Sequence, residues 1–463
     1  MSLHALVLAV WCLTQVAVGI WIARRLRDSA DFFVAGRSLS AGAIFATFLA
    51  ANIGAGSTVG ATAYAYEHGL AAWWWNGSAG IGTLILALWV GPRLWRVARE
   101  HNLFTVGDYL AHRYSDGVRG LTAALIWLGS FSILSGQLIG ASVVLYVVFG
   151  WPTWFGGLVA ILIVTVYFGT GGLLSSSWVN RVQIVVILAG FLVAALLGLS
   201  AAGGWDVVTA ANADRMNFWR GRTPDMGWPL IFLLAPSFFL SPGLVQRAFA
   251  ARDETHLRRG IAISGIALMA FAALPVLIGL TARAALPPLA DPQTALPEML
   301  RTGVTPWVGA LALAAVFAAE ISSADAVLFM LSTSGARDLY KRFVNRSATD
   351  AQLLTAVRVI AVIAAVAGYV LTFVVGTVIG ALKIFYSIMT VSLLVPILAT
   401  LVLKAPTVAA AYTSVIAGIT ALFLVAWMTG GAGYGWASPV FIALLVSGAA
   451  FGLATALRPN REM

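Results

Sequence analysis

Charged residues and cysteine are scarce in this chain of 463 residues. Lysine, arginine, aspartate and glutamate make up 10% of it, against 60% hydrophobic residues, and this balance is not that of a soluble protein. Cys12 is its one cysteine, which excludes an internal disulfide. The five histidines show no zinc-binding spacing, and no nucleophile, phosphate-loop or nucleotide motif occurs in a polar segment. We therefore expect neither an enzyme nor an organic cofactor.

Long apolar runs take up most of the chain. About thirteen of them are long enough, at roughly 20 residues, to cross the ~30 Å of hydrocarbon in a bilayer. The first lacks a small-residue cleavage site, which favours a retained helix over a removed signal. We predict an all-α polytopic membrane protein with about 13 transmembrane helices and no soluble domain. The runs lie approximately at 3–23, 40–65, 70–92, 118–149, 152–170, 177–201, 227–246, 260–281, 305–332, 352–376, 378–402, 406–428 and 436–456.

The net charge of +10 follows the order of these runs. Basic clusters come after the first, third, seventh and ninth runs, for example at Arg24, Arg93, Arg252 and Arg337. These connections share one side of the membrane if every run crosses once. By the positive-inside rule, the N-terminus lies outside and the C-terminus in the cytoplasm of a bacterial inner (plasma) membrane. The basic residues thus indicate how the chain crosses the lipid bilayer. No nucleic-acid partner is expected.

Two runs carry residues that interrupt a helix. Run 40–65 contains Gly54 and Gly56, which each cost roughly 1 kcal/mol relative to alanine in a helix interior. Run 227–246 contains Pro236 and Pro242, which remove backbone donors. At membrane depth, irregular backbone persists only where it is buried in protein or lines a polar cavity. Alternatively, both runs reflect only the general frequency of glycine and proline in membrane helices.

The positions of the two interrupted runs suggest an internal repeat. Without the first run, they open successive groups of five helices, which is typical of an inverted-repeat transporter with its site at mid-membrane. We therefore treat 1–463 as a single transmembrane domain. It consists of an extra N-terminal helix and cytoplasmic loop (1–37), a first five-helix repeat (38–201), a second (226–402) and two extra C-terminal helices (406–456).

A pair of serines lies in the middle of run 305–332. Ala319, Ser322 and Ser323 fall at i, i+3 and i+4 and share one helix face. Hydroxyls in hydrocarbon need partners, and two of them beside a small alanine can hold a desolvated cation such as sodium. Serine and alanine also let helices approach closely. The spacing alone therefore leaves helix packing open as an alternative.

Five segments resemble, in order, the landmarks of the sodium:solute symporter family, which includes bacterial sodium-coupled sugar, proline and sialic acid transporters. They are DFFVAGRSLS, FTVGDYLAHRY, GQLIGA, VQRAFAARD and STSGARDLYKRF. The resemblance spans most of the chain and implies a five-plus-five inverted-repeat core of the leucine-transporter (APC) type. It also implies a sodium site formed by carbonyls of the broken first core helix and by a carbonyl and two hydroxyls of the eighth. The matching residues are Ala50, Ile53, Ala319, Ser322 and Ser323.

Three ionisable residues lie inside apolar runs, where a charge costs about 2.5 to 3.5 kcal/mol. Some relatives have a second cation site that includes an aspartate on the fifth core helix. Asn180 stands at that position, whereas Asp325 takes one often held by serine, and our hypothesis is that a carboxylate has moved across the same cavity. Asp325, Asn180 and Glu320 are therefore our candidates for a second cation or a proton, although Glu320 could instead be neutral or face a watery passage. Lys383 would anchor an anionic substrate or, as we favour, pair with Asp325 or Glu320.

The solute is predicted from the same resemblance. The family's substrate positions fall here on Asn52, Ser57, Asn76, Phe238, Ser241 and Pro242. Sugar-transporting relatives carry longer polar side chains at Ser57, Asn76 and Ser241, so a sugar is disfavoured. The segment SPGLVQR is similar to the proline-transporting branch, although Asn52 replaces its aspartate. We therefore predict an amino acid or small carboxylate. Trp73, Trp74 and Trp75 either cover this solute or, as we favour, form an interfacial belt.

The resemblance implies a secondary active transporter. We expect monomeric, sodium-coupled symport of a small solute by alternating access. The first alternative is a proton-coupled symporter on the same fold, with Asp325 or Glu320 as carrier. A second is a solute sensor, since the fold also occurs fused to signalling kinases; the chain ends at Met463 soon after the last run, so a sensor would need a separate partner. A passive channel is the least favoured.

Overall fold

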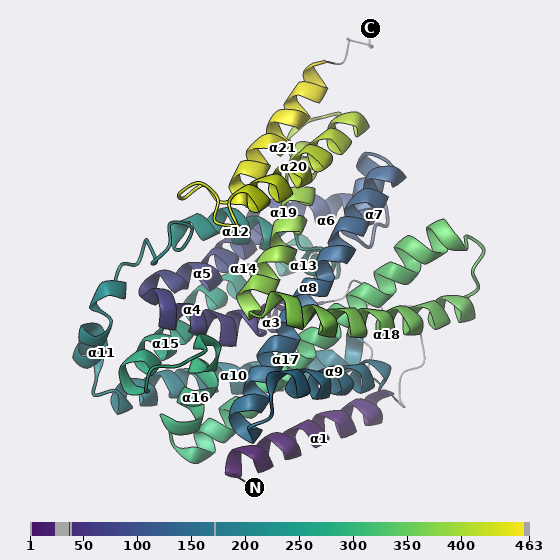
Figure 1. The fold of residues 1–463 in the computed structure, drawn as a ribbon. Coiled ribbons are helices and arrows are strands. Elements are labelled where there is room, and N and C mark those ends of the chain that lie inside the picture. The colour runs from purple at the N-terminus through teal and green to yellow at the C-terminus, as the bar shows by residue number, and fades with distance from the viewer. Residues whose placement is uncertain (1, 24–36, 38, 171–172, 458–463) are drawn as a thin grey trace.

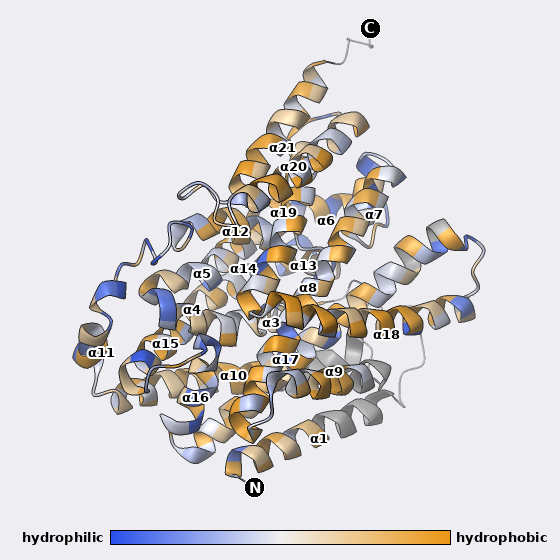
Figure 2. Cartoon of the chain, viewed as in Figure 1, coloured by the Kyte–Doolittle hydropathy of each residue, from blue (hydrophilic) through white to orange (hydrophobic). Residues whose placement is uncertain are grey.

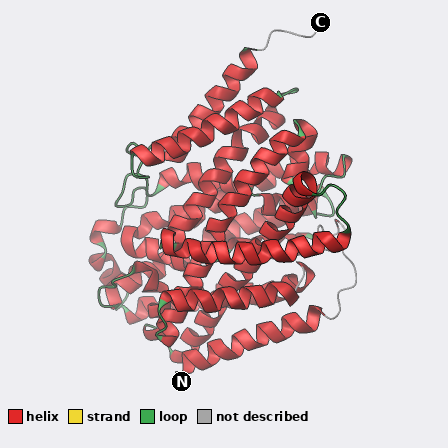
Figure 3. Cartoon of the chain, turned by 45° about the vertical axis from the view of Figure 1, so that its right-hand side comes forward, coloured by secondary structure: helices red, strands yellow, loops and turns green. Residues whose placement is uncertain are grey.

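The computed structural model describes residues 2–23, 37, 39–170 and 173–457. Within 15–23, 166–170 and 173–183, and at 337–338, 342–343 and 350, only the backbone is described. The described chain is nearly all helix (Figure 3), and its only β-type pairings are three isolated bridges. The all-α prediction is confirmed. Most of the DFFVAGRSLS segment lies outside the described residues.

The helices follow the predicted runs closely (Figure 1). They are α1 Leu3–Ala23, α3 Ala41–Asn52, the π-helical turn η2 Gly56–Gly60, α4 Ala61–His68, α5 Trp73–Ile85, α6 Gly91–Glu100, α7 Val106–Arg113, α8 Asp116–Phe149, α9 Thr153–Thr170, α10 Leu173–Ala201, α11 Trp205–Ala211, α12 Ile231–Leu240, α13 Pro242–Phe249, α14 Glu254–Phe271, α15 Ala273–Ala285, α16 Ala295–Thr302, α17 Pro306–Ser334, α18 Asp350–Val375, α19 Val378–Val402, α20 Val408–Met428 and α21 Pro439–Ala456.

Ten helical stretches in the described residues are long and apolar enough to cross a membrane. Three shorter apolar helices, Leu3–Thr14, Ala41–Asn52 and Thr153–Thr165, fall within predicted runs. The count of about thirteen crossings is therefore not confirmed. One reason is that the second half of run 40–65 continues into run 70–92 as the single stretch Gly56–Glu100, because a 3-10 turn at Gly69–Ala72 joins them.

Outward apolar faces fit a multi-pass membrane protein. Val374 is 77% exposed and Trp427 82% exposed, which suits contact with lipid. Hydrophobic residues run along the long helices, whereas hydrophilic residues gather in connections such as those beside α11 (Figure 2). Short polar residues begin many helices: Thr105 and Asp108 form a capping box at α7, and Ser115 caps α8.

The centre of the molecule is formed by helices from both predicted repeats. α17 packs against α8, α10 and α1, while α19 packs against α8, α12 and α20. The first repeat contributes α3, η2 and α8 to this centre, and the second contributes α12, α17 and α19. The two C-terminal helices α20 and α21 pack on each other and on α19, beyond the core (Figure 1). Elements distant in sequence therefore meet around one interior region.

Candidate functional site

The predicted interruption of the first core helix is present. α3 ends at Asn52, and Ile53 is extended, with φ −100° and ψ 98°. Helical structure resumes at Gly56, first as the π-helical turn η2 and then as α4. All residues from Asn52 to Gly60 are buried. The irregular backbone is therefore enclosed by protein, as membrane depth requires.

Amide groups at this break bond to partners that a continuous helix would not use. The Gly54 amide donates to Ser57 Oγ at 3.0 Å, and the Ser57 amide donates to the Gly54 carbonyl at 3.0 Å. In an uninterrupted helix these amides would bind the carbonyls of Ala50 and Ile53, four residues earlier. The break thus frees two carbonyls, and these are carbonyls that the family resemblance implies as sodium ligands.

The serine face of α17 lies directly against the break. A Cβ atom built on Gly54 would come within 2.7 Å of Ser323 Oγ and 2.9 Å of Gln137 Oε1. Ser323 is half-buried, and Ala319 is 4% exposed. The Ser323 hydroxyl of α17 and the broken backbone at Gly54, from opposite halves of the chain, therefore lie side by side. Carbonyl and hydroxyl oxygens are the hard ligands that alkali and alkaline-earth cations prefer.

Gln137 of α8 holds the break in place. Its Oε1 accepts the amide of Ala55 at 2.9 Å. Asn76 of α5 acts similarly, since its Nδ2 donates to the Ser57 carbonyl at 3.1 Å. Sequence reasoning did not assign Gln137 a function, although a buried glutamine in an apolar run is the kind of residue that needs one.

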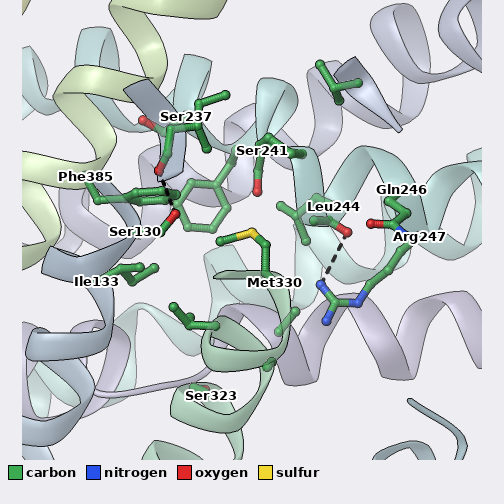
Figure 4. A pocket seen from close by; sticks show the side chains of 18 of the residues that line it. Ser130, Ile133, Ser237, Ser241, Leu244, Gln246, Arg247, Ser323, Met330 and Phe385 are labelled. Atoms are coloured by element: carbon green, nitrogen blue, oxygen red, sulfur yellow. Dashed lines mark hydrogen bonds between the residues drawn. The ribbon is translucent and has the colours of Figure 1, made fainter. Parts of the chain in front are cut away.

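A cavity of about 590 Å³ adjoins the break. Most of the predicted site residues line it: Ala50, Asn52, Ser57, Asn76, Phe238, Ser241, Pro242, Ser322, Ser323 and Asp325. Ile53, Ala319, Glu320 and Lys383 are outside this lining set. Figure 4 shows Met330 in the middle of the view, between Ser241, Ser323 and Arg247.

The second interruption lies at Ser241, which has φ −51° and ψ 120° between α12 and α13. Pro242 begins α13, where its missing N–H costs nothing. Run 227–246 is therefore interrupted as predicted, at Pro242, whereas Pro236 lies inside α12 without ending it. Ser237, the next residue, donates from Oγ to the Leu233 carbonyl at 2.6 Å.

Trp75 also differs from its predicted place in an interfacial belt. It is 3% exposed and lines the cavity beside Tyr386, with ring centroids 6.2 Å apart. Trp74 donates from Nε1 to the Phe218 carbonyl at 3.0 Å, which places it under the connection between α11 and α12. The sequence WWW did not show which of the three tryptophans faces the cavity, because adjacent residues on a helix point in different directions.

The buried carboxylates have separate surroundings. Glu320 is 0% exposed, and neither carboxylate oxygen has a hydrogen-bond partner in the described part of the chain. It lies beside α8, since a Cβ on Gly140 would approach its Oε1 within 3.1 Å. Asp325 is 9% exposed and lines the cavity, with Oδ1 unpartnered among the described residues. The side chain of Asn180 lies outside the described residues.

Lys383 does not pair with Asp325 or Glu320, and our preferred prediction for it is wrong. Its Nζ lies 3.2 Å from Asp225 Oδ2 and 5.7 Å from the centre of the Tyr64 ring. The connection that precedes α12 folds over the start of α19 and supplies this carboxylate. Long-range pairing of this kind leaves no local sequence pattern.

Asp225 precedes the membrane-spanning stretch that begins at Trp228. Burial acts to raise the pKa of Asp225, but the Lys383 charge and a hydrogen bond from Thr223 outweigh it and hold that pKa below its usual value. A lowered carboxylate pKa adds stability above the unfolded-state pKa, which is lost as pH falls through the folded-state pKa. The ion pair should therefore persist at neutral and mildly acidic pH.

Lys383→Gln should destabilise the protein by about 1 kcal/mol, since both partners are partly exposed. Thermal unfolding in detergent measures this. The loss of stability relative to the wild type should stay the same from neutral to mildly acidic pH. Lys404→Gln is the matched control, because Lys404 is exposed. Equal effects of both substitutions would contradict a stabilising role for the Lys383–Asp225 pair.

Comparison with known proteins places the chain in a family. The family model for the sodium:solute symporter family matches residues 32–418. The sodium/glucose cotransporter of Vibrio parahaemolyticus is 25% identical over 400 residues, 78% of this chain and 72% of that protein. The high-affinity proline transporter PutP of Bacillus subtilis (strain 168) is 24% identical over 353 residues, 73% of this chain and 74% of that protein.

A solved structure supports the predicted fold class. The substrate-bound outward-open state of a Na+-coupled sialic acid symporter superposes with a TM-score of 0.80 at 18% identity. The superposition covers 99% of this chain and 98% of that one. At this identity the likeness establishes the leucine-transporter-like fold only. Together with the match of the family model, which covers most of the chain, it leads to one conclusion: the chain is a member of the sodium:solute symporter family.

Proposed function

We propose that this protein is a sodium-coupled symporter that takes up an amino acid or small carboxylate by alternating access. The observation that carries the proposal is the contact between the Gly54 break and Ser323. The Ala50, Ile53 and Ala319 carbonyls and the Ser322 and Ser323 hydroxyls would hold the ion. Its working unit is a monomer of two five-helix repeats, 38–201 and 226–402, flanked by 1–37 and 406–456.

The ion would couple the two repeats. Sodium bound between α3 and α17 draws together elements that belong to different halves of the fold, so ion binding favours one arrangement of them. One positive charge crossing 100 mV supplies about 2.3 kcal/mol. At about 1.4 kcal/mol per tenfold, this supports roughly fifty-fold accumulation of solute. A single sodium ion is therefore sufficient to drive uptake of a solute without net charge, such as a zwitterionic amino acid, whereas a carboxylate anion would need the sodium gradient or a second cation.

The orientation follows the positive-inside rule, with the N-terminus outside and the C-terminus in the cytoplasm of the bacterial inner membrane. In this orientation the cavity reaches the cytoplasmic side, since Thr105 and Asp108 also line it. On the outer side, the Lys383–Asp225 pair and the Trp74–Phe218 hydrogen bond close the path. These features suit an inward-facing state.

A binding screen tests ion and solute together. Amino acids, carboxylates, sugars and vitamins are added to the purified protein in sodium and in potassium, and thermal stabilisation is measured. We expect stabilisation by an amino acid or carboxylate in sodium only. Equal stabilisation in potassium, with uptake at acidic pH in the absence of sodium, would instead indicate proton coupling. Stabilisation without any uptake into proteoliposomes would favour a sensor.

Asp325 is our candidate for a second cation. It lies in the cavity three residues after Ser322, and its Oδ1 is unpartnered among the described residues. Asp325→Asn should reduce the number of charges moved per solute by one, because a neutral amide does not compensate a second cation. Parallel sodium and solute fluxes in proteoliposomes measure this ratio. An unchanged ratio would remove Asp325 from the coupling mechanism.

A further inference from the structure

Arg247 places a guanidinium group in the cavity. It belongs to α13, and it has no ion pair in the described part of the chain. Its Nη1 makes a long hydrogen bond, 3.4 Å, to the Gly243 carbonyl. In Figure 4 the guanidinium points toward Met330. By contrast, Arg119, another arginine of the lining, is paired with Asp108 at 2.9 Å. Arg247 therefore has unused hydrogen-bond donors, because a guanidinium carries five N–H donors.

The space beside Arg247 is open. A Cβ built on Gly243 would meet only one atom within 4 Å, Arg247 Nη1 at 3.7 Å. Gly243 lies in the first turn of α13, which begins after Ser241 without a side-chain cap. Amides of a first helical turn have no partner within the helix, and they add partial positive charge. Guanidinium and amides thus border the same open part of the cavity.

An unused donor lies elsewhere in the cavity lining. Asn52 Nδ2 is buried at the end of α3 and has no hydrogen-bond partner among the described residues. A buried donor without an acceptor is costly. Asp325 Oδ1 is instead an unused acceptor, and it lies on α17, which carries the serine pair. The cavity therefore offers donors on α3 and α13, and acceptors for cations on α17.

We propose that Arg247 recognises the carboxylate of the transported solute. This inference rests on the proposed function and deepens it by selecting a carboxylate-bearing solute and the residue that binds it. Guanidinium and carboxylate match in geometry and form paired, charge-assisted hydrogen bonds. Arg247 thereby takes the role of anion anchor that the sequence suggested for Lys383, whose charge is neutralised by Asp225.

Charge-selective labelling tests this without knowledge of the natural solute. Met330 also lines the cavity, so Met330→Cys in a Cys12→Ser background provides one thiol beside Arg247. Its labelling rates with an anionic and a cationic methanethiosulfonate, the ethylsulfonate and ethyltrimethylammonium reagents, are compared. Arg247→Gln should lower the anionic-to-cationic rate ratio about tenfold. Arg93→Gln, which removes an exposed cation outside the cavity lining, should leave the ratio unchanged.

Protection from labelling tests the chemical class. Propanoate should slow labelling of Met330→Cys more than its neutral analogue propanamide does, and this difference should disappear in Arg247→Gln. A rate ratio that changes less than twofold, or equal protection by both compounds, would overturn the inference. Sodium-dependent stabilisation of the same proteins is measured separately. If it is missing while the ratio behaves as expected, the sodium proposal fails and the anion site stands.

Discussion

Replacing both hydroxyls of α17 (Ser322→Ala with Ser323→Ala) is expected to abolish sodium-dependent stabilisation and uptake. The two hydroxyls are two of the five proposed ligand oxygens, and an interaction with a charged group contributes about 1.5 to 3 kcal/mol. Losing both should weaken sodium affinity at least about a hundredfold. A sodium titration of thermal stability, followed by uptake into proteoliposomes, measures the change.

Ser332 provides the control for this experiment. It lies on the same helix and is 0% exposed, and its Oγ donates to the Phe329 carbonyl at 3.1 Å. It is not part of the cavity lining. Ser332→Ala should therefore leave sodium affinity unchanged. If the double substitution on α17 also left it unchanged, Ser322 and Ser323 would serve helix packing, the alternative that the sequence left open.

Gly54→Ala should reduce sodium affinity at least about tenfold, because the added methyl group displaces the side chains packed against the break. The new methyl group would lie 2.7 Å from Ser323 Oγ and 2.9 Å from Gln137 Oε1. Both side chains would have to rotate away, so Ser323 would leave the proposed ion site and the Ala55 amide would lose its acceptor. A buried amide without an acceptor costs about 1 to 3 kcal/mol. Sodium titration and thermal unfolding measure the two effects.

Gly42 is the matched position for that substitution. It also belongs to α3, but a Cβ built there has no neighbour within 4 Å. Gly42→Ala should therefore keep sodium affinity and stabilise the helix by up to about 1 kcal/mol. An unchanged affinity in Gly54→Ala would mean that Ser323 is not held against the break in the ion-binding state.

Much of the architecture was predictable because it depends on local patterns. Apolar runs of sufficient length predicted the helices, since backbone groups in a bilayer must be satisfied within each segment. Gly54 and Gly56 predicted the first break correctly. Pro242 marked the second break, whereas Pro236 lies within a continuous α12, since a proline inside a membrane helix is tolerated when neighbouring groups satisfy the freed backbone.

The cavity was only partly predictable. Asn52, Ser57 and Ser323 were named as site residues from the resemblance, and all three line the cavity. Arg247 lay within a recognised segment, VQRAFAARD, but nothing in that segment indicates that its side chain enters the cavity. Gln137 was missed as well, because its role depends on one amide in a different helix.

By itself, the sequence determined the helical class, the membrane setting, the interrupted first core helix and the serine pair on α17. These features follow from composition and from periodicity over a few turns. Only the tertiary structure decided that Ser323 lies against Gly54, that Lys383 pairs with Asp225, and that Arg247 faces the cavity. The physical reason is that contacts between distant helices depend on how whole surfaces pack, whereas helix formation and helix breaking depend on adjacent residues.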